Sequence, residues 1–266
     1  MAYDAVVNYR TMRVTLIVVL AAACSAQTHS VRLADLSWKE AADVLKPGAV
    51  VMIPLGAESK EHGPHLKLSN DRLMADFLAN QVMQRTTVVV APTINYHFYR
   101  AFVDYPGATS LRFETARDLV VDICRGLARF GPRRFYILNT GVSTVRPLEA
   151  AVAELSKDGI TLRYTDLLKA DAAVESEIKQ EKEGTHADEI ETSEMLYIAP
   201  ESVNMKLAAK DFPKGSPLQW KDPNGAGYSP SGIYGDATLA TRAKGEKIAN
   251  AEIDYIVRDI EALRAR

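Results

Sequence analysis

Short apolar runs alternate with amphipathic helical patterns from residue 48 onward, and this alternation limits the possible folds more than any other feature. Runs rich in Val, Ile, Tyr or Leu predict strands at residues 50–55, 87–91, 134–139 and 160–165. Apolar residues spaced three and four apart predict helices at 71–85, 113–130, 143–157 and about 241–264. This rhythm favours one α/β domain with a mostly parallel sheet flanked by helices.

Two segments interrupt the rhythm. Residues 171–183 are highly charged and hold few apolar side chains, so we expect a solvated helix or an arm. Residues 211–235 are rich in Pro, Gly, Ser, Asp and Tyr without periodicity, which indicates a long loop. Long loops inside compact domains are frequently functional, so this one is a candidate for part of a binding site.

The first thirty residues differ in character from the rest. Arg10 and Arg13 precede an apolar stretch too short to span a bilayer comfortably, and small residues follow, as in a secretory signal peptide. We therefore expect residues 1–26 to be a signal, with Met12 as a second candidate start, and residues 31–266 to form the exported domain. Cleavage after Ala26 would release a periplasmic or secreted protein, whereas acylation at Cys24 would give a lipoprotein. The alternatives are a buried N-terminal helix and an intracellular enzyme with a mistaken start.

The charge balance excludes some partner classes. The chain has 32 basic and 34 acidic residues and no basic stripe, so a small molecule is a better candidate partner than nucleic acid. With 47% hydrophobic residues it can build a sizeable core. Cys124 lies on the apolar face of a predicted helix and would be the only thiol of the mature form, so no disulfide framework is expected.

Acidic and imidazole side chains gather directly after the first predicted strand. Glu61, His62, His65 and Asp71 lie in a turn-rich segment containing Gly and Pro. The carboxyl end of a strand is where open α/β sheets bind ligands, so this segment predicts a metal site. A lone histidine is more frequently a core or surface residue, and Asp71 is also a candidate N-cap, but the clustering favours ligation.

A second group lies at residues 184–193. Thr185 with Asp188 resembles a capping box, which would place His186 in the first turn of a helix and Glu189 one turn further on. The alternative is an exposed acidic helix start, which the helix dipole favours. The spacing alone does not choose between a site and a solvated helix end.

Taken in order, these stretches resemble the creatininase (creatinine amidohydrolase) family. Its members typically carry P-x-G-S-x-E-Q-H-G-P-H-L-P-L-x-T-D after the first core strand, which residues 54–56 and 62–71 match closely. Residues 105–111 read Y-P-G-A-T-S-L, and residues 186–193 match the family's H-A-G-E-x-E-T-S. Residues 231–236 with 240–241 complete the series, which runs from about residue 45 to 250.

The resemblance implies a three-layer α/β/α sandwich and a metallohydrolase that acts on non-peptide C–N bonds of cyclic amides or formamides. It further implies two metals bridged by an aspartate and a hexameric assembly. Carried over by position, His62, the bridging Asp71 and Glu189 would hold one metal, and His186 and Glu191 would lie near the substrate. Such ligands suit zinc, manganese or iron.

The chain departs from the family pattern at the second metal. Where the family usually has N-G-H-G-G-N, this chain reads N-T-G-V-S-T, so Gly141 replaces a ligand histidine. An added residue before His62 puts Lys60 at the usual glutamate position, with Glu61 beside it. Glu61, Glu58 or His97 are the residues that could substitute.

Our main expectation is therefore one metal per chain, with two as the alternative. A metal-activated water would attack an amide, and His186 would pass the proton to the leaving nitrogen. The competing hypothesis is a small-molecule binding protein that has kept the fold and lost the chemistry. The survival of His62, Asp71, His186, Glu189 and Glu191 favours the enzyme.

Overall fold

A five-stranded parallel sheet forms the centre of the protein, whose computed structural model describes Met1 and residues 29–265. The strand order is β1-β3-β2-β4-β5. The strands are β1 (Val31–Arg32), β2 (Val50–Leu55), β3 (Val89–Val90), β4 (Arg134–Asn139) and β5 (Thr161–Tyr164). The predicted strands at 50–55 and 134–139 are confirmed residue for residue, and the predicted α/β class is confirmed.

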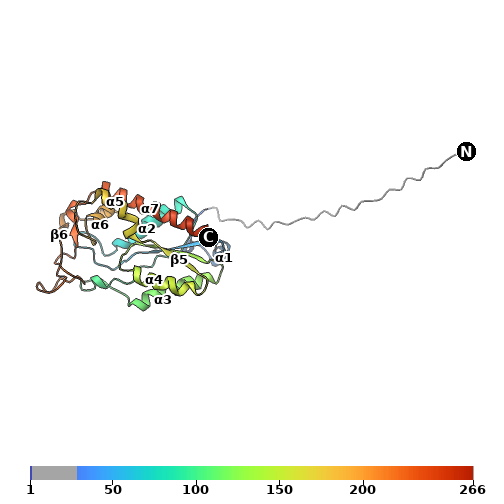
Figure 1. Ribbon diagram of the computed structural model, residues 1–266, viewed down its shortest axis with the longest axis horizontal. Helices are drawn as coiled ribbons and strands as arrows, with labels where there is room; N and C mark the ends of the chain where they lie inside the picture. Colours follow the sequence, from blue (N-terminus) through green and yellow to red (C-terminus); the bar gives the residue numbers. More distant parts are fainter. Residues whose placement is uncertain (2–28, 266) are drawn as a thin grey trace.

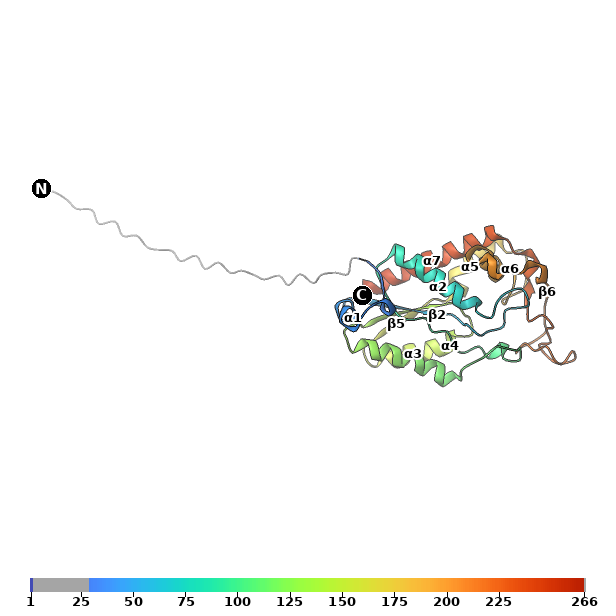
Figure 2. The ribbon, with the colours of Figure 1, turned by 180° about the vertical axis from the view of Figure 1, so that it is seen from behind.

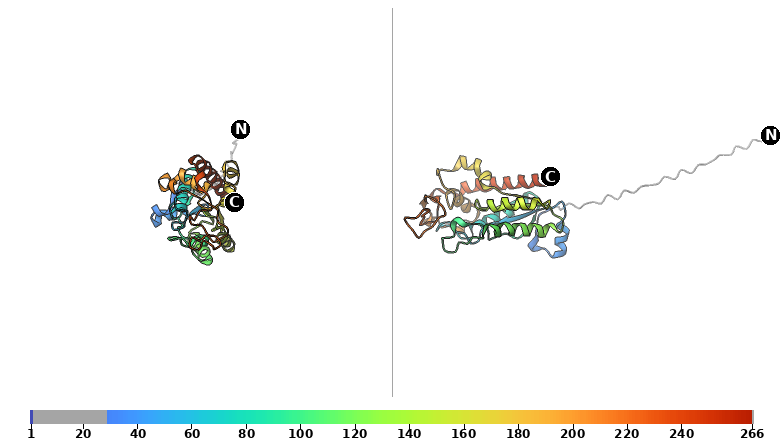
Figure 3. Two further views of the ribbon diagram at one scale, coloured as in Figure 1. Left: turned by 90° about the vertical axis from the view of Figure 1, so that its left-hand side faces the viewer. Right: turned by 60° about the horizontal axis from the view of Figure 1, so that its bottom comes forward.

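Helices cover both faces of this sheet. One face carries α2 (Asn70–Arg85) and α7 (Arg242–Arg264), and the other carries α3 (Phe113–Ala128) and α4 (Val145–Ser156). Figure 1 shows these two helical layers above and below the sheet, and Figure 2 shows the same arrangement from behind. The long helices run along the long axis of the domain (Figure 3). The result is a three-layer α/β/α sandwich.

The remaining elements are short. They comprise α1 (Trp38–Val44), α5 (Leu167–Ile178), α6 (Glu189–Ile198) and an antiparallel pair, β6 (Lys210–Asp211) with β7 (Gly235–Asp236). Single 3-10 turns occur at Leu33–Asp35, Arg100–Phe102, Pro200–Ser202, Met205–Leu207 and Ala237–Leu239. Residues 212–234 form no helix or strand, as the composition of the 211–235 segment predicts. The charged segment at 171–183 is helical only as far as Ile178, within α5.

The side chains of β2 divide the core into two halves. Val51, Ile53 and Leu55 face α3 and α4, whereas Val50 and Met52 face α2 and α7. Every residue of this strand is buried, because a central parallel strand is covered on both faces. That burial explains why its sequence is continuously apolar rather than alternating.

The chain reverses direction across the sheet at β2. It passes from β2 through α2 to β3 on one side, and then through α3 to β4 on the other side of β2. In open α/β sheets such a switch point leaves a crevice at the carboxyl ends of the strands, where ligands bind. The segments that follow β2 and β4 are therefore the expected location of a site.

The expected signal at residues 1–26, with Met12 and Cys24, lies outside the described residues apart from Met1. Within the described part of the chain, no helix combines the length and apolar character that crossing a membrane requires.

Gly56, at the end of β2, is where the strand and α2 approach most closely. A Cβ atom there would lie 2.1 Å from the backbone oxygen of Asp71 and 2.9 Å from the Cβ of Ala75. A side chain would have to push α2 away from the sheet and displace Asp71 with it.

We expect Gly56→Ala to lower the free energy of unfolding by about 2–3 kcal/mol, as overpacking does. Gly126→Ala is the matched control, because its Cβ would meet nothing within 4 Å on the exposed side of α3. That change should raise the free energy of unfolding by about 1 kcal/mol through helix propensity. Urea unfolding followed by circular dichroism measures both, and equal midpoints for Gly56→Ala and the wild type would contradict the expectation.

Candidate active site

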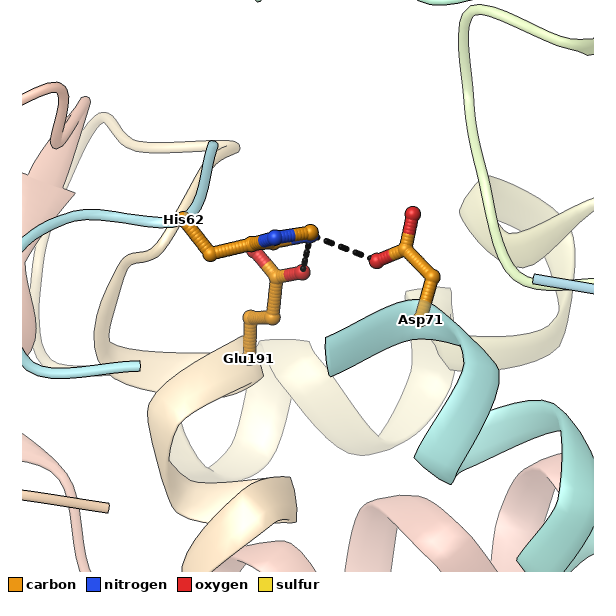
Figure 4. Close-up of side chains that lie close together, drawn as sticks. All are labelled: His62, Asp71 and Glu191. Carbon is orange, nitrogen blue, oxygen red and sulfur yellow. Dashed lines mark hydrogen bonds and ion pairs between the residues drawn. The ribbon is translucent and has the colours of Figure 1, made fainter. Parts of the chain in front are cut away.

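Three donor side chains converge beside the ends of β2 and β4. His62 Nε2 lies 2.6 Å from Asp71 Oδ1 and 3.3 Å from Glu191 Oε1. One donor atom from each residue lies within 4.8 Å of the other two. Figure 4 shows the His62 ring directed between the two carboxylates, which come from the first turns of α2 and α6.

The orientation of His62 fits a cation at this position. Its Nδ1 lies 3.0 Å from the backbone oxygen of Lys60, so Nδ1 must carry a proton and donate it. Nε2 then faces two carboxylate oxygens, which repel a bare lone pair unless a proton or a metal ion lies between them. Burial lowers the pKa of His62, but the charges of Asp71 and Glu191, together with the hydrogen bond to Asp71, outweigh that effect and raise the pKa to about 9. A histidine whose other nitrogen donates to a carbonyl is the usual arrangement of a metal ligand.

Glu191 is held from both sides by the backbone around α6. Asp188 caps this helix by accepting hydrogen bonds from the backbone N–H groups of Ile190 and Glu191. The Ala187 N–H donates to Glu191 Oε2 at 2.7 Å, and Asn70 Nδ2 donates to Oε1 at 3.1 Å. Burial raises the pKa of Glu191, but the positive neighbours led by His62 bring it well below its usual range.

His186 and Glu61 form a second pair next to this cluster. His186 Nε2 lies 3.0 Å from Glu61 Oε2, and Nδ1 lies 3.7 Å from Glu191 Oε2. The Phe102 ring packs on the imidazole with centroids 4.0 Å apart. The other oxygen of Glu61 accepts a hydrogen bond from the Gly63 N–H. Glu61 is thus turned toward His186 rather than toward Asp71.

The capping box predicted at Thr185 is wrong. The helix begins at Glu189 with Asp188 as its N-cap, and His186 precedes it, in an antiparallel bridge to Tyr234. The tight turn at Ala187 (φ 48°) separates His186 from the helix, so the spacing rules of a helix do not apply to it.

Glu189 does not lie with His62 and Asp71, although the resemblance assigns it there. Its buried carboxylate accepts hydrogen bonds from the backbone N–H groups of Gln180 and Glu181 and forms an ion pair with Lys244. Glu191, two residues further on, takes its place in the cluster. Glu191 therefore occupies the position that the resemblance gives to Glu189, whereas Glu189 is held away from both the cluster and the cavity lining.

The residues considered as substitutes at a second metal also point elsewhere. Glu58 pairs with Arg72 and Asn95 on the surface. His97 donates from Nε2 to the backbone oxygen of Ala116 on α3, and burial lowers its pKa to about 4. His65, the other histidine of the segment that follows β2, hydrogen-bonds Thr192 and is likewise held neutral by burial, with its pKa lowered to about 4.

Lys60 occupies the other side of Asp71. Its Nζ lies 3.0 Å from Asp71 Oδ2, and the residue is 6% exposed. Burial lowers the pKa of this ammonium group, but the carboxylates of Asp71 and Glu191 more than offset that effect and raise it. Asp71 therefore accepts from His62 with one oxygen and from Lys60 with the other.

A family model for creatinine amidohydrolase matches residues 34–260. The chain belongs to the creatininase family. Creatinine amidohydrolase of Pseudomonas putida is 30% identical to it over 241 residues, covering 83% of this chain and 92% of that protein. A mycofactocin precursor peptide peptidase of Mycolicibacterium smegmatis is 29% identical over 208 residues, covering 75% and 79%. A mutant creatininase of the Zn-Zn type has a TM-score of 0.70 and 26% identity, covering 88% of this chain and 98% of that one.

In this creatininase-family chain the donor cluster borders a cavity of about 450 Å³. Lys60, His186 and Glu191 line it on the side of the cluster. The lining also includes three buried acids that sequence reasoning missed, Asp171, Glu194 and Glu252. They lie on three different helices, α5, α6 and α7, and meet only through tertiary packing, so no local sequence pattern brings them together.

These three acids resist ionisation. Burial, together with their mutual repulsion, raises the pKa of Asp171 to about 8 and that of Glu252 well above its usual range, and burial raises that of Glu194 to about 7. Each has one oxygen without a hydrogen-bond partner. In the unfolded chain the same groups ionise near pH 4, so folding retains protons between about pH 4 and 8.

We therefore expect the free energy of unfolding of the metal-free protein to fall as pH rises from 5 to 8. In this range the folded state binds more protons than the unfolded state, so removing protons from solution favours unfolding. Glu194→Gln should flatten that decline. Glu201→Gln, which changes an exposed acid, is the control and should leave the slope unchanged. Calorimetric melting temperatures at several pH values in EDTA measure it, and parallel curves for Glu194→Gln and the wild type would refute the assignment.

Proposed function

We propose that the protein hydrolyses the C–N bond of a small amide with one divalent metal ion held by His62, Asp71 and Glu191. The observation that carries this proposal is the convergence of these donors next to the His186–Glu61 pair at the edge of a cavity. One nitrogen and two carboxylate ligands suit zinc, manganese or iron. A divalent ion there would polarise the amide carbonyl and lower the pKa of a water molecule.

His186 is the residue placed to move the proton. It lines the cavity, and its Nε2 is held by Glu61 while Phe102 fixes the plane of the ring. A carboxylate behind an imidazole orients it and stabilises its protonated form, so Glu61 supports proton uptake by His186 and its return to the leaving nitrogen. Glu61 thus has a positioning role here in place of metal ligation.

The cavity favours a neutral or basic amide over an acid. Its lining includes the buried acids Asp171, Glu194 and Glu252, whose raised pKa values indicate that negative charge is unfavourable there, so an anionic substrate would bind less well. By their names, one relative acts on creatinine and another on the mycofactocin precursor peptide. A volume of about 450 Å³ suits a small, compact amide, and we propose a non-peptide one.

We further propose that the enzyme is exported and assembles as a homohexamer. Support comes from the basic, apolar and small-residue order of residues 10–26 and from the family resemblance. Mass spectrometry of the mature protein should find its N-terminus after Ala26, whereas an intact Met1 or Met12 would exclude cleavage.

Glu191→Gln and Glu189→Gln form a matched pair that tests the metal ligands. Glu191→Gln should lose the tightly bound ion, because an amide oxygen replaces a charged donor that contacts His62. Glu189→Gln should keep the ion and lower the free energy of unfolding by about 2 kcal/mol, because Lys244 loses its ion pair with the buried carboxylate. Inductively coupled plasma mass spectrometry measures the number of metal ions per chain in each variant. Loss of metal in Glu189→Gln with retention in Glu191→Gln would restore the assignment implied by the resemblance.

His186→Asn should keep the metal and lower kcat by about 10²–10⁴, the range expected for loss of a general acid–base. The substrate comes from a screen of lactams, cyclic ureides and formamides on the metal-loaded protein. Asn keeps a polar amide close to the position of the imidazole Nδ1 but cannot take up and release a proton near neutral pH. Unchanged kcat would remove His186 from the mechanism, and no hydrolysis of any amide by the metal-loaded wild type would favour the competing binding protein.

A further inference from the structure

We infer that the ammonium group of Lys60 takes the place and the charge of a second metal ion, so that the centre pairs one divalent ion with one built-in organic cation. This inference rests on the proposed function, since it concerns the same site. It explains how a chain that lacks two ligands of the second metal still keeps the bridging carboxylate.

The carboxylate of Asp71 has the contacts of a bridge. Its Oδ1 is 2.6 Å from His62 Nε2, on the side of the donor cluster, and its Oδ2 is 3.0 Å from Lys60 Nζ. In a two-metal site a bridging aspartate offers each oxygen to a different cation. Here the second oxygen is already satisfied by a cation that is part of the chain.

The surroundings of Lys60 suit an ammonium group and offer no set of metal ligands. Its Nζ lies 5.1 Å from the centroid of the Phe102 ring and 5.8 Å from that of Tyr99, within range of a cation–π interaction. The turn after β4 provides Gly141 at the position of the family histidine, and a Cβ added there would lie 3.7 Å from Tyr99 Cε1. Within residues 29–265, His62, Asp71 and Glu191 form the one group of three or more metal-type donors this close together.

The local charges balance with one divalent ion. Glu61, Asp71 and Glu191 contribute three negative charges, and Lys60 contributes one positive charge, which leaves two negative charges for a single divalent ion to neutralise. A second divalent ion would leave the buried centre with two excess positive charges. Excess charge in a buried site is costly, so this balance favours one ion.

Lys60 also faces the cavity. An ammonium group has three N–H donors, and among the described residues Lys60 Nζ donates one hydrogen bond, to Asp71. The remaining donors are therefore available to the carbonyl oxygen of an amide bound in the cavity. Stabilising developing negative charge on that oxygen is the task that a second metal would otherwise perform.

The Lys60→Met variant tests the inference, because it removes the positive charge and keeps the buried aliphatic part of the side chain. Lys67→Met is the control, since Lys67 is an exposed lysine of the same loop. Without the ammonium, Asp71 should bind zinc or manganese more tightly, by about tenfold or more for a neighbouring charge at an effective dielectric near 20. The metal-induced rise in melting temperature should be larger than in the wild type. The kcat of any amide hydrolysis should nevertheless fall, and a merely structural lysine would not produce that split.

Lys60→Glu extends the test, because it restores the family's carboxylate and should raise the metal content from one equivalent toward two. Two tightly bound equivalents in the wild type would overturn the inference. The inference would also be overturned if metal raised the melting temperatures of Lys60→Met and Lys67→Met by the same amount. A metal content of one equivalent per chain in Lys60→Glu would overturn it as well. These results do not depend on turnover, so a protein that hydrolyses no amide would refute the proposed function while leaving the metal measurements to decide the role of Lys60.

Discussion

The site depends on one fully buried carboxylate, that of Asp71. A charge with no exposure is tolerated only if it is paired and hydrogen-bonded, and Asp71 meets this condition through His62 on one oxygen and Lys60 on the other. Its position follows from the backbone, because Gly56 lets the first turn of α2 approach the end of β2. The packing of the central sheet thus fixes the atom around which the cations are arranged.

Other segments bring their side chains to this fixed point. The loop after β2 supplies Glu61 and His62, and α6 supplies Glu191 with the help of the Asp188 cap. Gly232 allows the loop at residues 212–234 to pass close to Glu61, since a Cβ atom at Gly232 would lie 2.1 Å from Glu61 Oε1. Segments separated by more than a hundred residues therefore meet at one centre, where backbone groups hold His62, Glu61 and Glu191 in place.

The sequence predicts the scaffold better than it predicts the ligands. Buried parallel strands are continuously apolar, so β2 and β4 could be placed to the residue, and the resemblance identified the segments that carry the site. The choice between Glu189 and Glu191 depended on where α6 begins. Because the helix starts at Glu189 and not near Thr185, Glu191 lies next to His62 and Glu189 faces Lys244. The acids on α5, α6 and α7 meet only through tertiary packing, which no periodicity reveals.

The same geometry fixes the side from which a substrate can approach. His62 and Asp71 lie behind the cavity wall, whereas Lys60, His186 and Glu191 line it. Since Lys60 already satisfies the second oxygen of Asp71, a divalent ion held by His62, Asp71 and Glu191 would act on a substrate that enters from the cavity, where His186 also lies. A substrate carbonyl entering there would meet the ammonium of Lys60 on one side and the imidazole of His186 on the other. The ammonium group of Lys60 would stabilise negative charge on the carbonyl oxygen, and His186 would carry the proton to the leaving nitrogen.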